Sequence, residues 1–194
     1  KGGFMFDVKG SCAFADIQTL KLLIGVFNSC VTPIYVEALN PTTTTQVGDI
    51  KRIPLPLPNG DVRARIEKLV DQNILISKAD WDAYEFSWDF QRHPLIEYSR
   101  VEEHESATIV VTPNGEEMVP TTELCIRLET AYCEWERIAK ERFEQLKANE
   151  EELNRIFIDI YGLRDELTPE VANEGVTVRL ADKQRDIRAL ISYL

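Results

Sequence analysis

The stretch TTELCIRLETAYCEWERIAKERFEQLKANEEELNRIFIDIY, residues 121–161, predicts the dominant element of this protein, a single long helix. Apolar residues recur in steps of four and three from Leu124 to Ile138, the spacing of a coiled coil. The pattern slips by one position to Phe143 and resumes as far as Ile160, and such a slip changes the supercoil locally. The seam fits packing within the chain better than a homodimer zipper, which stays the alternative.

Shorter helices are predicted on both sides of this element. Apolar residues at helical spacing follow Asp16, a residue type that caps helices, and the pattern is expected to end or kink at Pro33. Another helix follows Asn59-Gly60, and a short one begins near Lys78. Helix starts are also expected at 168–170 and near 182, with a short strand at 176–180 between them. Four aromatic residues are expected to close a small core: Trp81, Tyr84, Trp88 and Phe90.

The β content is expected to be small. Two short strands around a glycine turn are predicted at 3–15, and alternate prolines favour an extended chain at 51–58. Asn114-Gly115 predicts a β-hairpin insertion near 100–119. We therefore expect a mainly α member of the α+β class. Its domains would be 1–58, with the β elements, and 59–194, a helical spacer with a long coiled-coil-like helix and the hairpin.

Composition places the chain among ordinary globular proteins. Of its 194 residues 44% are apolar and 28% are charged, and no apolar run approaches the ~20 residues of a membrane span. The four cysteines form no CxxC pair, so we expect reduced thiols, a cytoplasmic location, no metal site and no membrane partner. The chain begins with Lys1 and stops inside an amphipathic pattern, from which we expect an excised piece of a longer protein.

The motifs of several enzyme classes are absent from the sequence. There is no glycine-rich loop after a strand and no Asn-Pro-Pro-Tyr-like tetrapeptide, the two features that a SAM-dependent adenine methyltransferase needs. Walker, G-x-S-x-G and H-E-x-x-H motifs are also missing. We therefore assign no catalytic, cofactor-binding or metal-binding residue to this chain.

Five short stretches, in this order and spacing, resemble the end of a target-recognition domain as found in type I restriction specificity subunits and many methyltransferases. They are residues 10–14 (GSCAF), 27–30 (FNSC), 40–42 (NPT), 46–50 (QVGDI) and 53–56 (IPLP). The resemblance implies that this part of the chain lies near DNA. The polar residues at its turn and exit are the candidate DNA contacts: Lys9, Ser11, Gln46, Lys51 and Arg52.

The charge distribution supports this choice of segment. Residues 1–60 carry five basic and four acidic side chains, a net charge of +1, whereas 61–194 carry −12. A phosphate backbone repels a strongly acidic surface. We therefore expect DNA contact only in the first 60 residues, and weak or no duplex binding by the chain alone.

Five further stretches resemble a more specific family, the PglX-type adenine-specific DNA methyltransferases of BREX type 1 phage-exclusion systems. They are residues 76–85 (ISKADWDAYE), 87–95 (SWDFQRHPL), 142–154 (RFEQLKANEEELN), 161–163 (YGL) and 165–171 (DELTPEV). The resemblance covers most of the chain and implies a region that follows the catalytic domain. It also implies that S-adenosylmethionine binds elsewhere in the parent protein, which would act on duplex DNA together with other phage-defence or restriction–modification subunits.

Two other functions stay open from the sequence. One is a fragment of a type I restriction specificity subunit, which binds DNA and has no catalytic domain. The other is a coiled-coil adaptor unrelated to DNA. In the leading interpretation the chain is a non-catalytic part of a SAM-dependent N6-adenine methyltransferase that orients target recognition and docks partner subunits.

Overall fold

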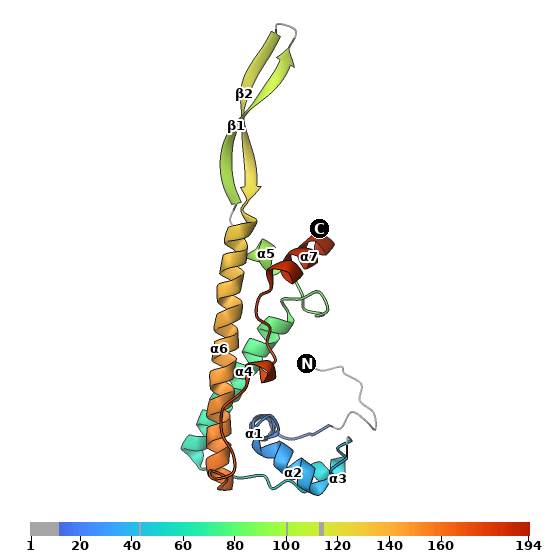
Figure 1. Ribbon diagram of the computed structural model, residues 1–194, viewed down its shortest axis with the longest axis vertical. Coiled ribbons are helices and arrows are strands. Elements are labelled where there is room, and N and C mark those ends of the chain that lie inside the picture. Colours follow the sequence, from blue (N-terminus) through green and yellow to red (C-terminus); the bar gives the residue numbers. More distant parts are fainter. Residues whose placement is uncertain (1–11, 43, 100, 113–114) are drawn as a thin grey trace. The chain divides into compact units, whose positions relative to one another are not determined.

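The chain is mainly helical, as the sequence predicts. The computed structural model describes residues 12–42, 44–99, 101–112 and 115–194, with side chains outside 101–126 (Figure 1). Its helices and strands, in chain order, are α1 (Ile17–Phe27), α2 (Val31–Leu39), α3 (Val47–Ile50), α4 (Gly60–Trp81), α5 (Pro94–Glu97), β1 (Val101–Thr112), β2 (Gly115–Ile126), α6 (Leu128–Tyr161), the 3₁₀ turn η1 (Asn173–Gly175) and α7 (Lys183–Tyr193).

The chain divides into two compact units. The first comprises residues 1–78 and 144–177, and the second comprises residues 79–143 and 178–194. The predicted division at 58/59 follows the sequence resemblance and stays a prediction. No single helix among the described residues is long and apolar enough to cross a membrane, and α1 and α2 meet the length and composition only as a pair bent by 79°.

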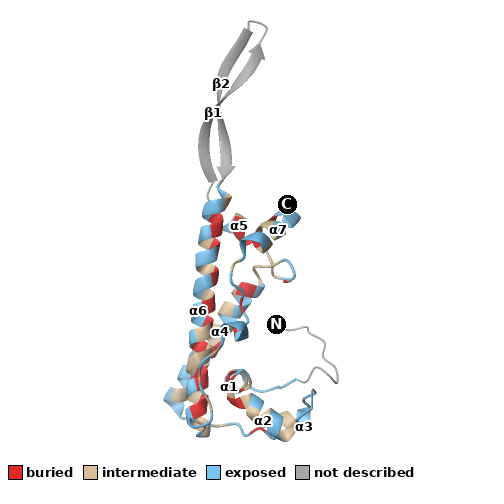
Figure 2. Ribbon diagram, viewed as in Figure 1, coloured by how far each residue is buried: buried red, intermediate tan, exposed pale blue. Residues whose placement is uncertain are grey.

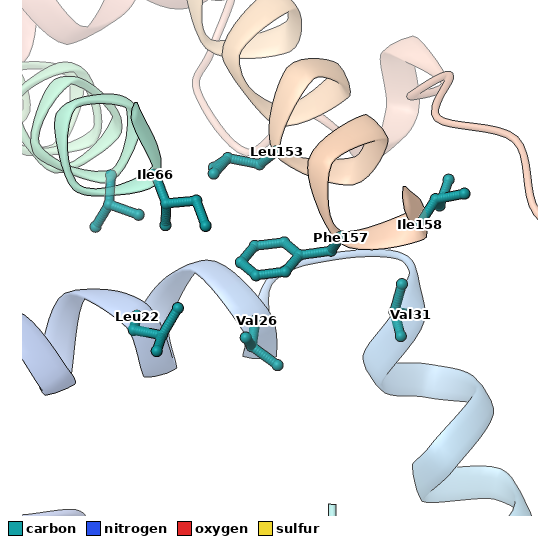
Figure 3. Close-up of a cluster of buried hydrophobic side chains, with 8 residues drawn as sticks. Leu22, Val26, Val31, Ile66, Leu153, Phe157 and Ile158 are labelled. Atoms are coloured by element: carbon teal, nitrogen blue, oxygen red, sulfur yellow. The ribbon is translucent and has the colours of Figure 1, made fainter. Parts of the chain in front are cut away.

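The core of the first unit is a contact between α1, α4 and α6. Phe157 of α6 is fully buried, and its ring lies between Val26 of α1 and Ile66 of α4 (Figure 3). Gly25 permits this close approach, because a Cβ at that position would lie 3.3 Å from both Phe157 and Ile66. The buried residues of this core are Leu22, Val26, Val31, Ile66, Val70, Leu153, Phe157 and Ile158.

A buried asparagine adds polar contacts beside this core. Asn154 of α6 is 5% exposed, and its Oδ1 accepts the backbone N–H of Cys30 at 2.9 Å. Its Nδ2 donates to the carbonyl of Pro169 at 3.1 Å. The side chain thus joins α6 to the break between α1 and α2 and to the segment that follows α6. Since a buried amide is costly without partners, this arrangement fixes all three segments.

Helix α6 ends as its glycine predicts. Gly162 has φ +70°, the left-handed conformation. Leu163 donates its N–H to the carbonyl of Ile158, and Gly162 donates to that of Asp159, the two bonds of a Schellman motif. Gly162 therefore ends α6 and allows the chain to turn back after the helix.

The second unit is built around Trp135, which is 1% exposed. Its indole Nε1 donates to the buried carboxylate of Asp186 on α7 at 2.9 Å. Tyr98 stacks on the indole with ring centroids 6.2 Å apart, and Tyr84 meets it edge-on. The buried residues of this core are Leu95, Tyr132, Trp135, Ala139 and Leu190.

The buried face of α6 follows most of the predicted seam and departs from it at Leu128, Ile138 and Ile160, which are only half-buried (Figure 2). Buried positions step by 3, 4, 4, 3, 3, 4 and 4 from Tyr132 to Phe157, which follows the period of about 3.6 of a straight helix. The buried pattern shifts by one position at Ala139 and not first at Phe143, since Ala139 is buried while Ile138 is half-exposed. Phe143 is buried as predicted. Leu124 lies in β2, so the predicted helix start at 121 or 122 is wrong.

Where the predicted short strands at 3–15 and 176–180 fall on described residues, no strand is formed. Of the two strands expected at 3–15, residues 1–11 lie outside the described part, and 12–15 have no regular structure. Residues 176–180 form no strand. Within this segment the side chains of Val176 and Val178 are buried. The two described strands, β1 and β2, are antiparallel with Thr112 opposite Gly115, and they occupy a longer range than the hairpin predicted at 100–119.

Some helix boundaries also differ from those predicted. The break between α1 and α2 lies at 28–30, and Pro33 sits in the first turn of α2, where its missing N–H costs nothing. No helix begins at 168–170, and α4 runs unbroken past Lys78 to Trp81. The cap at Asp16 and the helix start near 182 are confirmed, and the side chains of Asp16 and Asp182 each accept a backbone N–H three residues on.

The expected aromatic core is wrong in two of its four members. Trp88 is 99% exposed and Trp81 is 55% exposed, so neither closes the second unit. Tyr84 and Phe90 are half-buried, and Phe90 packs edge-on against Tyr193 at 5.7 Å. The missing volume comes from Tyr98 and from Trp135, of which Trp135 lies on α6, far from residues 81–90 in sequence.

Replacement of Trp135 tests this core. Trp135→Ala should lower the free energy of unfolding of the chain by ~3–5 kcal/mol, because it leaves a cavity and removes the hydrogen bond from the indole to Asp186. Cys133→Ala, on the exposed side of the same helix, should cost under ~0.5 kcal/mol. Urea unfolding followed by circular dichroism measures both. Equal effects of the two substitutions would contradict the packing described.

Candidate nucleic-acid interface

The structure brings three of the five predicted DNA contacts together on one short helix. Gln46 is the N-cap of α3, Lys51 is its C-cap and Arg52 follows directly, and all three are exposed. Lys9 and Ser11 lie outside the described residues. The predicted contacts at 46–52 therefore share one small surface, which we call the α3 surface.

The α3 surface is held by the carboxylate of Asp49. Its Oδ2 accepts the side-chain amide of Asn40 at 2.7 Å and the backbone N–H of Gln46 at 2.9 Å. The hydrogen bond from Asn40, then that from Gln46, and then the charge of Arg52 lower the pKa of Asp49. Because Asn40 is also the C-cap of α2, this network joins α3 to the end of the preceding helix.

The segment after α3 is anchored to the first unit. Ile53 is buried, and the hydroxyl of Tyr161 donates to the carbonyl of Pro54 at 2.6 Å. Burial raises the pKa of Tyr161 to about 12, so this donor keeps its proton at physiological pH. The anchor fixes the chain directly after Arg52.

An apolar cleft of about 250 Å³ lies beside Lys51. Its walls include Leu23 and Phe27 of α1 and Leu55 of the proline segment. Leu57, two residues further on, is 83% exposed. The α3 surface thus combines two exposed cations and an amide with an apolar neighbour.

This arrangement suits positioning on a nucleic acid better than chemistry. Lys51 and Arg52 outnumber Asp49, so residues 46–52 carry a net charge of +1 within a chain of net charge −11. Exposed lysine and arginine bind phosphate oxygens, and such contacts set register without reading bases. Within the described part of the chain, no group of three His, Cys, Asp or Glu side chains could hold a metal ion.

Sequence reasoning missed a cluster of cations and aromatic rings in the second unit. The guanidinium of Arg179 lies over the rings of Tyr84 and Phe86, at 4.6 and 5.0 Å, and its backbone N–H donates to Asp80. Burial, then the charge of Asp80, raises the pKa of Tyr84 to about 12. Arg179 falls within the strand predicted at 176–180, and no motif marks it. Its contacts are those of a packed cation–π group.

His93 has a structural role at the start of α5. Its Nδ1 accepts the backbone N–H of Leu95 at 3.2 Å, which caps α5, and the side chain is 5% exposed. Burial lowers its pKa, so the ring is neutral near physiological pH. A neutral ring fits the acceptor role that the cap requires.

The chain is similar in sequence to two proteins named adenine-specific methyltransferases. Over 192 residues, 98% of its length, the chain is 38% identical to a protein named adenine-specific methyltransferase PglX from Lacticaseibacillus casei strain Zhang. The predicted resemblance to PglX-type methyltransferases is confirmed. Over 99 residues, half of the chain, it is 32% identical to adenine-specific methyltransferase BrxX from Escherichia coli O9:H4 strain HS.

The chain spans 14% of the length of the PglX relative and 8% of that of BrxX. No protein-family model matches it. The similarity to PglX extends through both compact units, including the α3 surface and the core around Trp135.

The pH dependence of the α3 surface follows from Asp49. Its pKa is lowered from the ordinary value of 3.8, so the carboxylate accepts its two hydrogen bonds throughout the range above 3.8 and loses them only as the pH falls through the lowered pKa. An NMR titration of the Asp49 side chain should give a midpoint below 3.8.

Asn40→Ala is the matched control, since it removes the largest cause of the shift. The midpoint of Asp49 should then move up towards 3.8, with the carboxylate itself unchanged. A titration midpoint of Asp49 at or above 3.8 in the unsubstituted chain would contradict the network, and so would an unchanged midpoint in the Asn40→Ala variant.

Proposed function

We propose that the chain is a non-catalytic part of a SAM-dependent N6-adenine DNA methyltransferase of a phage-defence or restriction–modification system. In that protein it orients target recognition on duplex DNA and docks other subunits of the system. The observation that carries the proposal is the 38% identity to PglX over 98% of the chain. The small share of the relative that is matched fits a division of labour between this region and a catalytic domain elsewhere.

The residues of this chain do not fit the cofactor. The sequence has no glycine-rich loop after a strand, and the described residues before the hairpin form helices and irregular segments. S-adenosylmethionine therefore belongs, in this proposal, to the rest of the parent protein. The role of this chain is to position, and its site of action is the cytoplasm.

The proposed DNA contacts are Gln46, Lys51 and Arg52 of the α3 surface. Their exposure leaves the side chains available to phosphate, while Asp49 and the Tyr161 anchor hold the backbone on either side. Preorganised cations bind a ligand at lower entropic cost than mobile ones. Lys9 and Ser11 belong to the proposal by sequence alone.

The two alternatives differ in what they predict. A type I specificity subunit would carry a second recognition-domain repeat in the parent protein and no adenine methyltransferase motifs. A coiled-coil adaptor that dimerises would melt at a temperature that rises with protein concentration. The identity to two proteins named adenine-specific methyltransferases favours the first proposal over both.

Substitution of the α3 cations in the full-length protein tests the proposal. Lys51→Ala with Arg52→Ala should weaken duplex binding at low salt and reduce the slope of log affinity against log salt by about 2, one for each lost phosphate contact. The methylation rate at saturating DNA should be unchanged, since neither residue acts in catalysis. Fluorescence anisotropy over a salt series and incorporation of labelled methyl groups measure the two effects.

Lys68→Ala is the control for lost charge, because Lys68 is an exposed lysine on α4 of the same unit. It should leave the salt slope unchanged. An unchanged slope in the double variant would remove α3 from the DNA interface. The absence of adenine methylation by the full-length parent would remove the proposed function altogether.

A further inference from the structure

A second cleft lies in the first unit, away from the residues assigned to DNA. It has a volume of about 310 Å³, and α1, α4, α6 and the segment after α6 all contribute to it. Its apolar walls include Ile24 and Ile74, which are 42% and 43% exposed. Leu146 and Leu153 of α6 complete the apolar lining. Such a cleft leaves apolar surface open to solvent that a ligand could cover.

One charged group lines this cleft, the carboxylate of Glu150. The side chain is half-buried, and burial alone raises its pKa. Among the described residues no hydrogen bond or ion pair to Glu150 is formed. The nearest cations along α6 are engaged elsewhere, since Lys147 donates to Asn173 and Arg155 binds Glu152.

The neighbours of Glu150 in sequence show what is unusual about it. Glu151 accepts the backbone N–H of Val171 at 3.2 Å. Glu152 forms ion pairs with Arg65 and Arg155. Three consecutive glutamates thus point to different surroundings, and only Glu150 faces the cleft without a described partner. A carboxylate withdrawn from water without a counter-charge destabilises the protein, so the group calls for a cationic ligand.

We propose that this cleft binds the lysine side chain of a partner protein segment, with its ammonium on Glu150 and its aliphatic stem against Ile24, Ile74 and Leu146. A lysine combines a flexible apolar stem with a compact charge, the same combination of properties that the cleft presents. Ser77 and Asn28 also line the cleft, and their side chains contain oxygen atoms that can accept from an ammonium, which has three donors.

Charge supports a basic protein segment as the occupant. The chain has a net charge of −11, which attracts a basic partner from a distance. A nucleic acid would place phosphate next to Glu150, where both groups are negative. The inference goes beyond the proposed function, because lysine binding at this cleft requires neither DNA nor methyltransferase activity.

Three short peptides that differ at one residue test the proposal by NMR titration of the full chain. They carry lysine, Nε-acetyllysine or norleucine between capped glycines. The lysine peptide should shift the amide signals of the cleft residues and saturate. The other two should bind at least tenfold more weakly, since one has lost the charge and the other has lost the ammonium but kept an apolar stem.

Glu150→Gln should lower the affinity for the lysine peptide at least tenfold. Glu170→Gln, at an exposed site in the same unit, should leave that affinity unchanged. The melting temperature of Glu150→Gln at pH 7 should equal or exceed that of the parent, because the substitution removes a buried charge; this separates lost binding from lost folding. Equal binding of norleucine, full affinity in Glu150→Gln, or no saturable shift by the lysine peptide would each overturn the proposal.

Discussion

The position of the α3 surface depends on one buried amide, the side chain of Asn154. It accepts the N–H of Cys30 at the break between α1 and α2 and donates to Pro169 in the segment after α6. The bend fixed in this way directs α2, whose last residue is followed by the Asn40 that holds Asp49. A surface formed by residues 46–52 is thus oriented by a residue more than one hundred positions later. An apolar residue at 154 would fill the space but leave a buried N–H and a carbonyl without partners.

The apolar contact around Phe157 works together with this polar one. Dispersion and burial bring α1, α4 and α6 to a close approach at Gly25, yet apolar packing alone tolerates small rotations of a helix. The directional bonds of Asn154 remove that freedom. Non-directional packing therefore supplies most of the stability of the first unit, while the amide selects the one arrangement in which α3 and the Glu150 cleft are both formed.

Local signals in the sequence predicted the features that depend on neighbours along the chain. The caps at Asp16 and Asp182 and the left-handed Gly162 satisfy backbone groups within a few residues, so their chemistry can be recognised without the fold. Gln46, Lys51 and Arg52 are close because they are near in sequence, whereas the short helix α3 between them was not predicted. The acidity of the chain after residue 60 also follows from composition.

Features that depend on distant residues were not predictable in this way. Trp88 looks like a core residue by type, but Trp135 and Tyr98 fill the second unit and leave it exposed. The slip in the α6 seam at Ala139 arises from what packs against the helix, which the heptad pattern does not contain. The isolation of Glu150 could not be read from a run of three glutamates, because only the fold shows that its two neighbours have partners and that it has a cleft.

The most direct test of a DNA-facing α3 is site-specific photocrosslinking in the full-length protein bound to duplex DNA. A photoreactive residue placed at position 51 should form a covalent adduct with DNA, and the same residue at position 68 on α4 should not. Adduct formation at position 51 that a competing duplex suppresses would support the account. Equal labelling at both positions, or none at position 51 under conditions in which the protein methylates the same duplex, would contradict it.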